Sequence, residues 1–212
     1  MILWIAGYPR TGNTLTRLIL KRCFGIESAS LYREPKLTKL FPTFSGELVP
    51  KFMEWVPTLQ RSQQLVGLKT HGIPARPDNS PAIYTVRDGR DACVSASHFW
   101  QLELPRVICE GGKDIANWSA HYHSWRPRDR PKTLTLRYEQ TLADPPSAVA
   151  AIAQFLGIEP IAPWQDCFDE CKALWPRMFG SHTGSWQQEM TGADLELFWR
   201  IHGEVMRELG YQ

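Results

Sequence analysis

Four short runs of apolar residues are spaced along the chain in the way that is typical of buried parallel strands. They cover residues 2–6, 65–68, 82–86 and 133–136. Each run is too short for a helix and is bounded by polar residues, glycine or proline. We therefore expect each of them to be a strand of a parallel sheet.

Segments with helical periodicity lie between and after these runs. The clearest covers residues 146–156 and ends at Gly157, a favoured residue at a helix C-terminus. Its apolar positions follow the spacing i, i+3, i+4, i+7: Val149, Ile152, Ala153 and Leu156. Further helices are expected over residues 14–23, 91–101, 113–125 and 193–209. The alternation predicts an α/β fold over residues 1–212, a single domain in which an open, P-loop-like parallel sheet is flanked by helices on both faces.

The first strand leads into a loop bracketed by Gly7 and Gly12, with the sequence GYPRTGNT. Backbone N–H groups that converge at the start of the following helix form an anion site. The glycine spacing is that of a Walker A loop, but Asn13 stands at the position of its lysine and Arg10 lies inside the loop. We expect this loop to hold a phosphate group other than the β- and γ-phosphates of ATP.

The four strands end in polar, largely cationic groups. These are Arg10, Lys69-Thr70-His71, Arg87-Asp88 and Arg137-Tyr138. Ligands of open α/β sheets bind at the carboxyl ends of the strands, so these groups are expected to surround one site. A histidine there is suited to general base chemistry near neutral pH, and a lysine two residues earlier points to the same side of an extended chain.

Arg87 and Ser95 form a second candidate anion site. The guanidinium supplies a planar fork that matches phosphate oxygens, and the serine on the next helix adds a hydroxyl donor. The structural alternative is an ion pair between Arg87 and a nearby aspartate. Asp88 or Asp91 is expected to cap that helix.

Composition narrows the class of partner. A net charge of +2 without a dense Lys/Arg block gives no reason to expect nucleic acid. The five cysteines contain no C-x-x-C pair, and His121 and His123 have no third ligand at useful spacing. No metal site is therefore expected, and both histidines are placed on a helix surface.

No apolar run approaches the ~20 residues of a membrane span, and the predicted location is cytoplasmic.

At five ordered positions the chain resembles the cytosolic-type sulfotransferases, as a short, bacterial-like member. These enzymes use 3′-phosphoadenosine 5′-phosphosulfate (PAPS) as sulfuryl donor. The matching segments are residues 8–14, Lys69-Thr70-His71, residues 86–95, Arg137-Tyr138-Glu139 with residues 142–145, and Gly184-Ser185-Trp186. Five ordered matches at compatible spacings are far more specific than any single one.

The resemblance implies PAPS as co-substrate, no metal, and a small-molecule acceptor with a hydroxyl or amine. The implied PAPS-binding residues are Arg10, Thr11, Gly12, Asn13, Thr14, Arg87, Ser95, Tyr138 and Phe168. The implied catalytic residues are His71 as general base, Lys69 as the group assisting transfer, and Arg10 at the leaving phosphate.

The chain also departs from the family's pattern. Leu15 replaces a tryptophan that stacks on adenine, and Phe179-Gly180-Ser181 replaces an Arg-Lys-Gly contact to the 3′-phosphate, for which Arg177 or His182 is the expected substitute. Residues 28–60 are assigned to no element and are a candidate substrate-facing insertion. Two alternatives stay open: a P-loop kinase of small metabolites, and a non-catalytic protein that retains the nucleotide pocket.

Overall fold

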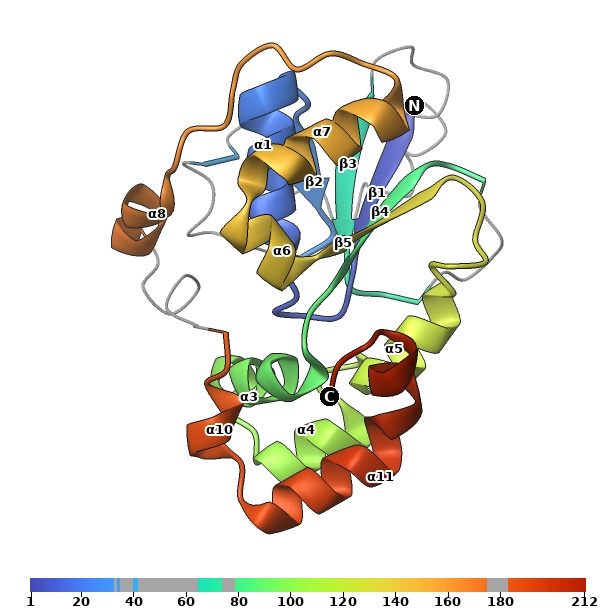
Figure 1. Cartoon of the computed structure of the whole chain (residues 1–212), viewed down its shortest axis with the longest axis vertical. Helices are drawn as coiled ribbons and strands as arrows, with labels where there is room; N and C mark the ends of the chain where they lie inside the picture. The colour runs from blue at the N-terminus through green and yellow to red at the C-terminus, as the bar shows by residue number, and fades with distance from the viewer. Residues whose placement is uncertain (33, 35–39, 42–64, 74–78, 175–182) are drawn as a thin grey trace.

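A five-stranded parallel sheet in the order β2-β3-β1-β4-β5 forms the centre of the chain (Figure 1). The computed structural model describes residues 1–32, 34, 40–41, 65–73, 79–174 and 183–212. The strands are β1 (Ile2–Ala6), β2 (Ser28–Ser30), β3 (Val66–Thr70), β4 (Ala82–Val86) and β5 (Thr133–Arg137). The four expected strands are confirmed. The short β2, Ser-Ala-Ser, was not expected because it has no apolar run of its own and becomes a strand by pairing with β3.

Helices connect and cover these strands. They are α1 (Asn13–Phe24), α3 (Gly89–Trp100), α4 (Leu104–Glu110), α5 (Trp118–Trp125), α6 (Tyr138–Ala143), α7 (Pro145–Leu156), α8 (Phe168–Leu174), α10 (Trp186–Glu189) and α11 (Gly192–Glu208). The expected helices at α1, α3, α7 and α11 are confirmed to within two residues. Among these helices none is long and apolar enough to cross a membrane, a finding limited to the described part of the chain.

The helix expected over residues 113–125 is wrong in its first turn. Lys113 and Asp114 have positive φ angles of 46° and 67°, which a right-handed helix excludes. The helix α5 begins only at Trp118, where the Asn117 side chain accepts a hydrogen bond from the Ala120 N–H at 3.0 Å.

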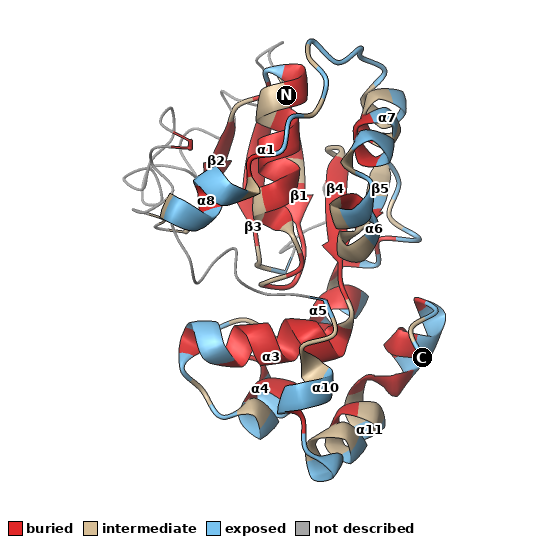
Figure 2. Cartoon of the chain, turned by 60° about the vertical axis from the view of Figure 1, so that its left-hand side comes forward, coloured by how far each residue is buried: buried red, intermediate tan, exposed pale blue. Residues whose placement is uncertain are grey.

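Alternating side chains of the central strands pack against different helices. Leu3, Ile5 and Ile83 lie in one buried cluster with residues of α1 and α7. Tyr84 belongs to the other main cluster, which joins the sheet to α3, α4, α5 and α11. Helices therefore cover both faces, as expected for a parallel sheet. In both views α3, α4, α10 and α11 lie beyond the carboxyl ends of the strands (Figures 1 and 2).

Burial follows this layering. Strands β1, β3 and β4 are almost wholly buried, whereas α7 and α11 expose one side (Figure 2). The apolar stripe predicted in α7 is the side that packs on the sheet, with Ile152 at 0% exposure. Gly157 ends α7 in the left-handed conformation at φ 65°, as its position after the stripe predicts.

Replacing Ile152 with alanine tests whether α7 is an essential cover of the sheet. We expect Ile152→Ala to lower the free energy of unfolding by about 2–5 kcal/mol, because it removes a buried side chain and leaves a cavity. Ile161→Ala is the matched control, since Ile161 is 73% exposed. Urea denaturation measures both, and equal losses would contradict the assigned packing.

Candidate active site

The loop between β1 and α1 is shaped for an anion. Gly12 is the residue before the helix and has φ 109°, a backbone conformation that favours glycine. A Cβ at Gly12 would also lie 2.8 Å from the ring carbon Cδ2 of Tyr138, so the position has no room for a side chain. Gly12, at the N-cap, has no side chain with which to cap α1, so N–H groups of the first turn can bind an anion.

Two side chains of this loop tie it to the end of β4. Thr11 Oγ1 donates to the Tyr8 carbonyl at 2.7 Å and lies 2.9 Å from Thr85 Oγ1. The Thr85 hydroxyl in turn donates to Asn13 Oδ1. Asn13, at the position of the Walker lysine, therefore fixes the loop to the sheet, and Thr11 supports the loop from within.

His71 follows β3 with one ring nitrogen already committed. Its Nδ1 lies 2.8 Å from the carbonyl oxygen of Gly7, so Nδ1 carries the proton and Nε2 is the basic nitrogen. Burial lowers the pKa of His71 well below its usual value, and the Lys69 charge lowers it further. The imidazole is therefore neutral near pH 7, as a general base requires.

His121 fixes the backbone of His71, and its predicted place on a helix surface is wrong. The side chain is fully buried under the site. Its Nε2 donates to the His71 carbonyl at 3.1 Å, and its Nδ1 accepts from the Tyr84 hydroxyl at 2.9 Å. Two residues that are two positions apart on a helix point to different sides. Only His123 of this pair is therefore exposed, and His121 points into the protein.

Lys69 lies two residues before His71 and is held by an acidic residue. Its Nζ forms an ion pair with Glu34, whose other oxygen accepts from Arg17 Nη1 at 2.6 Å. Burial lowers the pKa of Lys69, and the Glu34 charge partly offsets that effect. Burial alone would raise the pKa of Glu34, but Lys69 and Arg17 together bring it below its usual value.

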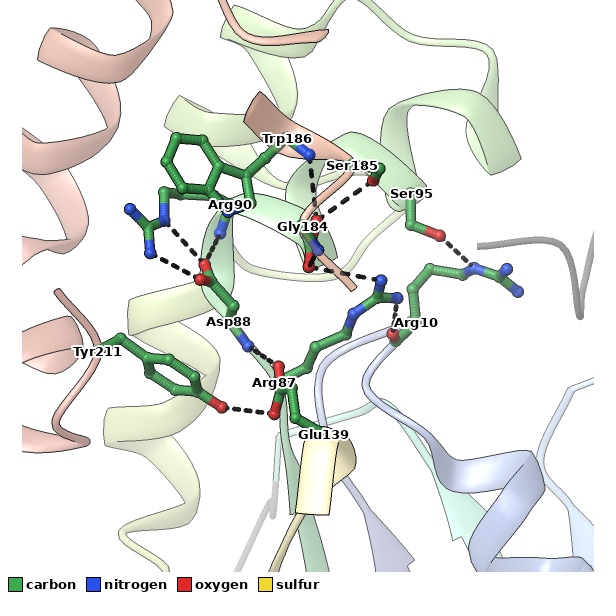
Figure 3. A network of polar contacts seen from close by, with 11 residues as sticks. Arg10, Arg87, Asp88, Arg90, Ser95, Glu139, Gly184, Ser185, Trp186 and Tyr211 are labelled. Carbon is green, nitrogen blue, oxygen red and sulfur yellow. Dashed lines mark hydrogen bonds and ion pairs between the residues drawn. The ribbon is translucent and has the colours of Figure 1, made fainter. Parts of the chain in front are cut away.

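Arg10, Ser95 and Arg87 form the cationic wall of the site (Figure 3). Arg10 Nε donates to Ser95 Oγ at 2.9 Å, and Arg87 Nη1 donates to the Arg10 carbonyl at 3.1 Å. The Arg87 guanidinium also lies 4.7 Å from the centre of the Tyr138 ring. Burial, with the neighbouring Arg87 charge, lowers the pKa of Arg10 to about 10, and the group is still protonated at neutral pH.

Both capping candidates at the start of α3 have defined roles, and Figure 3 labels one of them, Asp88. Asp88 caps the helix by accepting from the Arg90 N–H at 2.9 Å. Asp91 instead forms an ion pair with Arg87, with 3.8 Å between Asp91 Oδ2 and Arg87 Nη2. The ion pair considered as a structural alternative is therefore present. The Asp91 carboxylate also accepts from the backbone N–H groups of Gly184 and Trp186 at 2.7 and 3.1 Å. One carboxylate thus joins the Arg87 site to the segment before α10.

A single cavity collects most of the predicted site residues. Those that line it are Arg10, Gly12, Asn13, Thr14, Lys69, His71, Arg87, Tyr138 and Phe168. Thr11 and Ser95 are buried beside this lining, Thr11 within the loop and Ser95 behind Arg10. Trp100, the last residue of α3, also lines the cavity.

Sequence reasoning missed several lining residues. Tyr32 and Glu34 follow β2, and Lys113 and Ile115 lie on the turn before α5. Because β2 was not expected, nothing in the sequence indicated that residues 32 and 34 follow a strand end. Arg177, residues 179–181 and His182 lie outside the described residues, as do residues 42–60 of the candidate insertion.

The described ranges contain no group of three or more His, Cys, Asp or Glu side chains that is placed to hold a metal ion. Cys167 and Cys171 are buried, and their sulfur atoms lie 3.9 Å apart. Burial raises the pKa of both thiols, which is the behaviour of structural cysteines.

The arrangement defines a P-loop-like α/β protein with an anion-binding loop and a histidine at the adjoining strand end. Residues 2–210 match the sulfotransferase domain family. The chain belongs to this family, and the resemblance noted in the sequence is confirmed.

Two curated relatives illustrate the extent of the similarity. Sulfotransferase 2A1 of Macaca fascicularis is 34% identical over 87 residues, which are 35% of this chain and 30% of the relative. Flavonol 3-sulfotransferase of Flaveria bidentis is 25% identical over 184 residues, which are 77% of this chain and 58% of the relative. The chain therefore spans less than two thirds of the length of these relatives.

Solved structures agree on the fold. The mouse sulfotransferase SULT7A1 complexed with PAP gives a TM-score of 0.68 at 18% identity, covering 98% of this chain and 84% of that one. Retinol dehydratase in complex with androsterone and the inactive cofactor PAP gives a TM-score of 0.65 at 16% identity. The match covers 100% of this chain and 82% of that one. At these identities the comparison supports the shared architecture.

The buried His121 makes stability depend on pH. Burial lowers its pKa to about 4, while the unfolded chain has the ordinary value near 6.5. Stability present above about pH 6.5 is therefore lost as the pH falls toward about 4, by up to about 3 kcal/mol for this one group. The variant His121→Gln keeps a donor for the His71 carbonyl but has no imidazole to protonate. We expect its free energy of unfolding to fall less between about pH 7 and 5 than that of the unsubstituted chain.

The control for this prediction is His123→Gln, which removes an exposed imidazole from the same helix. Urea denaturation at each pH gives the free energy of unfolding for the three proteins. If His121→Gln and the unsubstituted chain lost the same free energy on acidification, the buried neutral state of His121 would be refuted.

Proposed function

We propose that the chain transfers a sulfuryl group from PAPS to a hydroxyl or amine of a small acceptor. The observation that carries the proposal is the convergence of the anion-binding loop, His71 and Arg87 on one cavity. Family membership gives the same reading. Phosphoryl transfer from ATP is less well supported. The Walker lysine is replaced by Asn13, which is uncharged and whose side chain holds the loop to Thr85.

The donor is proposed to bind along the cationic wall. The N–H groups at the start of α1, with Arg10, receive the 5′-phosphosulfate, supported by Thr14 beside them. Arg87 receives the 3′-phosphate, and Ser95 acts with it while contacting Arg10. Tyr138 and Phe168, which line the same cavity, are proposed to flank the adenine.

Transfer is proposed to proceed by in-line displacement at sulfur. His71 Nε2 takes the proton of the acceptor hydroxyl as its oxygen bonds to sulfur, and the bond from sulfur to the phosphate oxygen breaks. The negative charge that develops on the leaving phosphate is stabilised by the loop N–H groups and Arg10. Lys69 steadies the sulfuryl oxygens, since its ammonium lies on the same side of the extended chain as His71.

Replacing His71 with alanine tests the base. We expect His71→Ala to lower kcat by about 10²-fold or more, because proton removal from the acceptor is lost. Affinity for 3′-phosphoadenosine 5′-phosphate (PAP) should remain close to that of the unsubstituted chain. Transfer from ³⁵S-labelled PAPS to 4-nitrophenol and other phenols, alcohols, sugars and amines measures kcat, and calorimetry measures PAP affinity. Comparable turnover would remove His71 from the mechanism.

Replacing Arg87 tests the 3′-phosphate contact separately. Arg87→Ala should weaken PAP binding by about 1.5–3 kcal/mol, the range for a hydrogen bond between charged groups. Arg106→Ala on α4 is the control, because Arg106 is exposed and pairs with Glu110. Unchanged PAP affinity in a folded Arg87→Ala protein would refute this assignment.

The same assays separate the alternatives. A small-metabolite kinase would be stabilised by ATP with Mg²⁺ in a thermal-shift measurement. A non-catalytic nucleotide-binding protein would be stabilised by PAP and would transfer no label to any acceptor class. The proposal predicts stabilisation by PAP without added metal, together with transfer of the label.

A further inference from the structure

A buried chain of three charges borders the cavity, with Lys69 and Glu34 in its lining. Lys69 Nζ donates to one oxygen of Glu34, and Arg17 Nη1 donates to the other at 2.6 Å. The side chains of Lys69, Glu34 and Arg17 are 7%, 11% and 2% exposed, respectively. Water therefore screens this cluster little, and the carboxylate is the main source of negative charge for both cations.

Glu34 is itself anchored from behind. Arg17, which holds it, donates through Nε to Ser28 Oγ at 2.9 Å and through Nη2 to the Ser28 carbonyl at 3.2 Å. The Arg17 guanidinium also lies 3.7 Å from the centre of the Phe41 ring. A carboxylate fixed by such a guanidinium is a rigid point of attachment for Lys69.

Two other cations near Lys69 disfavour its charged form, Arg17 from α1 and Arg10 from the anion-binding loop. The centre of the Tyr32 ring lies 5.6 Å from Lys69 Nζ and attracts the ammonium only weakly. Burial and the charges of Arg17 and Arg10 lower the pKa of Lys69, whereas the Glu34 charge and its hydrogen bond raise it. Without Glu34, the ammonium would be buried beside like charges.

We propose that Glu34 is a positioning residue that fixes the Lys69 ammonium beside His71 and keeps it protonated for sulfuryl transfer. The role of Lys69 rests on the proposed function, whereas its dependence on Glu34 rests on the contacts above. Glu34 is not a binding group for a cationic acceptor, because both of its oxygens are engaged by cations. Nor is it suited to act as a general base, since the same two cations occupy its oxygens and bring its pKa below the usual value, which weakens it as a base.

Lysine titration tests the dependence without any substrate. In protein labelled with ¹³C at lysine Cε, the Lys69 resonance is identified by its loss in Lys69→Arg. We expect Glu34→Gln to move the Lys69 titration to lower pH by about 1–3 units, the usual effect of one close opposite charge. Glu34→Asp, which retains a carboxylate, should recover at least half of the shift. Equal titration of Lys69 in the Gln variant and the unsubstituted chain would overturn the proposal.

Glu110→Gln is the matched control, because Glu110 is an exposed carboxylate in an ion pair with Arg106 at 3.2 Å. It should leave the Lys69 resonance unchanged. Urea denaturation of each variant shows whether it is folded. If Glu34→Gln is not, the unsubstituted chain and Glu34→Asp supply the test, because both retain the carboxylate: Lys69 should be an ammonium at pH 7 in both proteins, and a neutral amine there would overturn the proposal.

Activity gives an independent readout. With PAPS and an acceptor found in the screen above, the alkaline limb of the kcat profile should move to lower pH in Glu34→Gln, because Lys69 loses its proton earlier. The same substitution in a Lys69→Arg background should leave that limb in place. If the unsubstituted chain transfers no sulfuryl group, the proposed function fails while the titration still decides the role of Glu34. If it transfers normally and Glu34→Gln keeps its profile, the inference alone fails.

Discussion

The structure depends on placing several cations around one cavity while most of their surface is withdrawn from water. Arg10 and Arg87 follow β1 and β4, and Lys69 lies near the carboxyl end of β3, so all three are at the same edge of the sheet. Burying like charges together is costly unless each is hydrogen-bonded or paired. The surrounding elements meet this requirement with fixed acceptors: the Ser95 hydroxyl for Arg10, the Glu34 carboxylate for Lys69, and the Arg10 carbonyl with Asp91 for Arg87. Two carboxylates against these three cations leave one positive charge, which favours an anionic ligand.

This constraint explains why segments far apart in the sequence are joined at the site. Asp91 balances Arg87 and at the same time accepts from the backbone of Gly184 and Trp186, so the start of α10 is fixed to the helix that follows β4. Glu34 does the equivalent on the opposite side, because it joins Lys69 on β3 to Arg17 on α1. Each carboxylate therefore has a structural and an electrostatic consequence. Removing either changes the charge of the cavity as well as its packing.

The sequence predicted those parts of the fold that are determined locally. Apolar runs located β1, β3, β4 and β5, and the stripe ending at Gly157 located α7, because burial and helix termination depend on neighbouring residues. The cavity-lining positions of Arg10, His71 and Arg87 follow from the same reasoning, since they come directly after strands or in the loop after β1. By contrast, β2 exists only through pairing with β3, and the turn at Lys113 and Asp114 depends on left-handed backbone angles. Without β2 the sequence placed Glu34 only within a candidate substrate-facing insertion, and it did not indicate that this carboxylate pairs with Lys69.

Histidines show how tertiary contacts decide chemical roles that spacing leaves open. His121 is fully buried and His71 partly buried; burial is the main cause that lowers the pKa of each, and both contact a backbone carbonyl. They differ in the second nitrogen. In His121 both nitrogens are engaged, one by the Tyr84 hydroxyl and the other by the His71 carbonyl, so the ring acts as a fixed support. In His71 the Gly7 carbonyl accepts from Nδ1, which leaves Nε2 as the basic nitrogen. His71 itself lines the cavity. A neutral imidazole with this tautomer can accept a proton from a substrate, and the adjacent ammonium of Lys69 opposes its protonation by solvent.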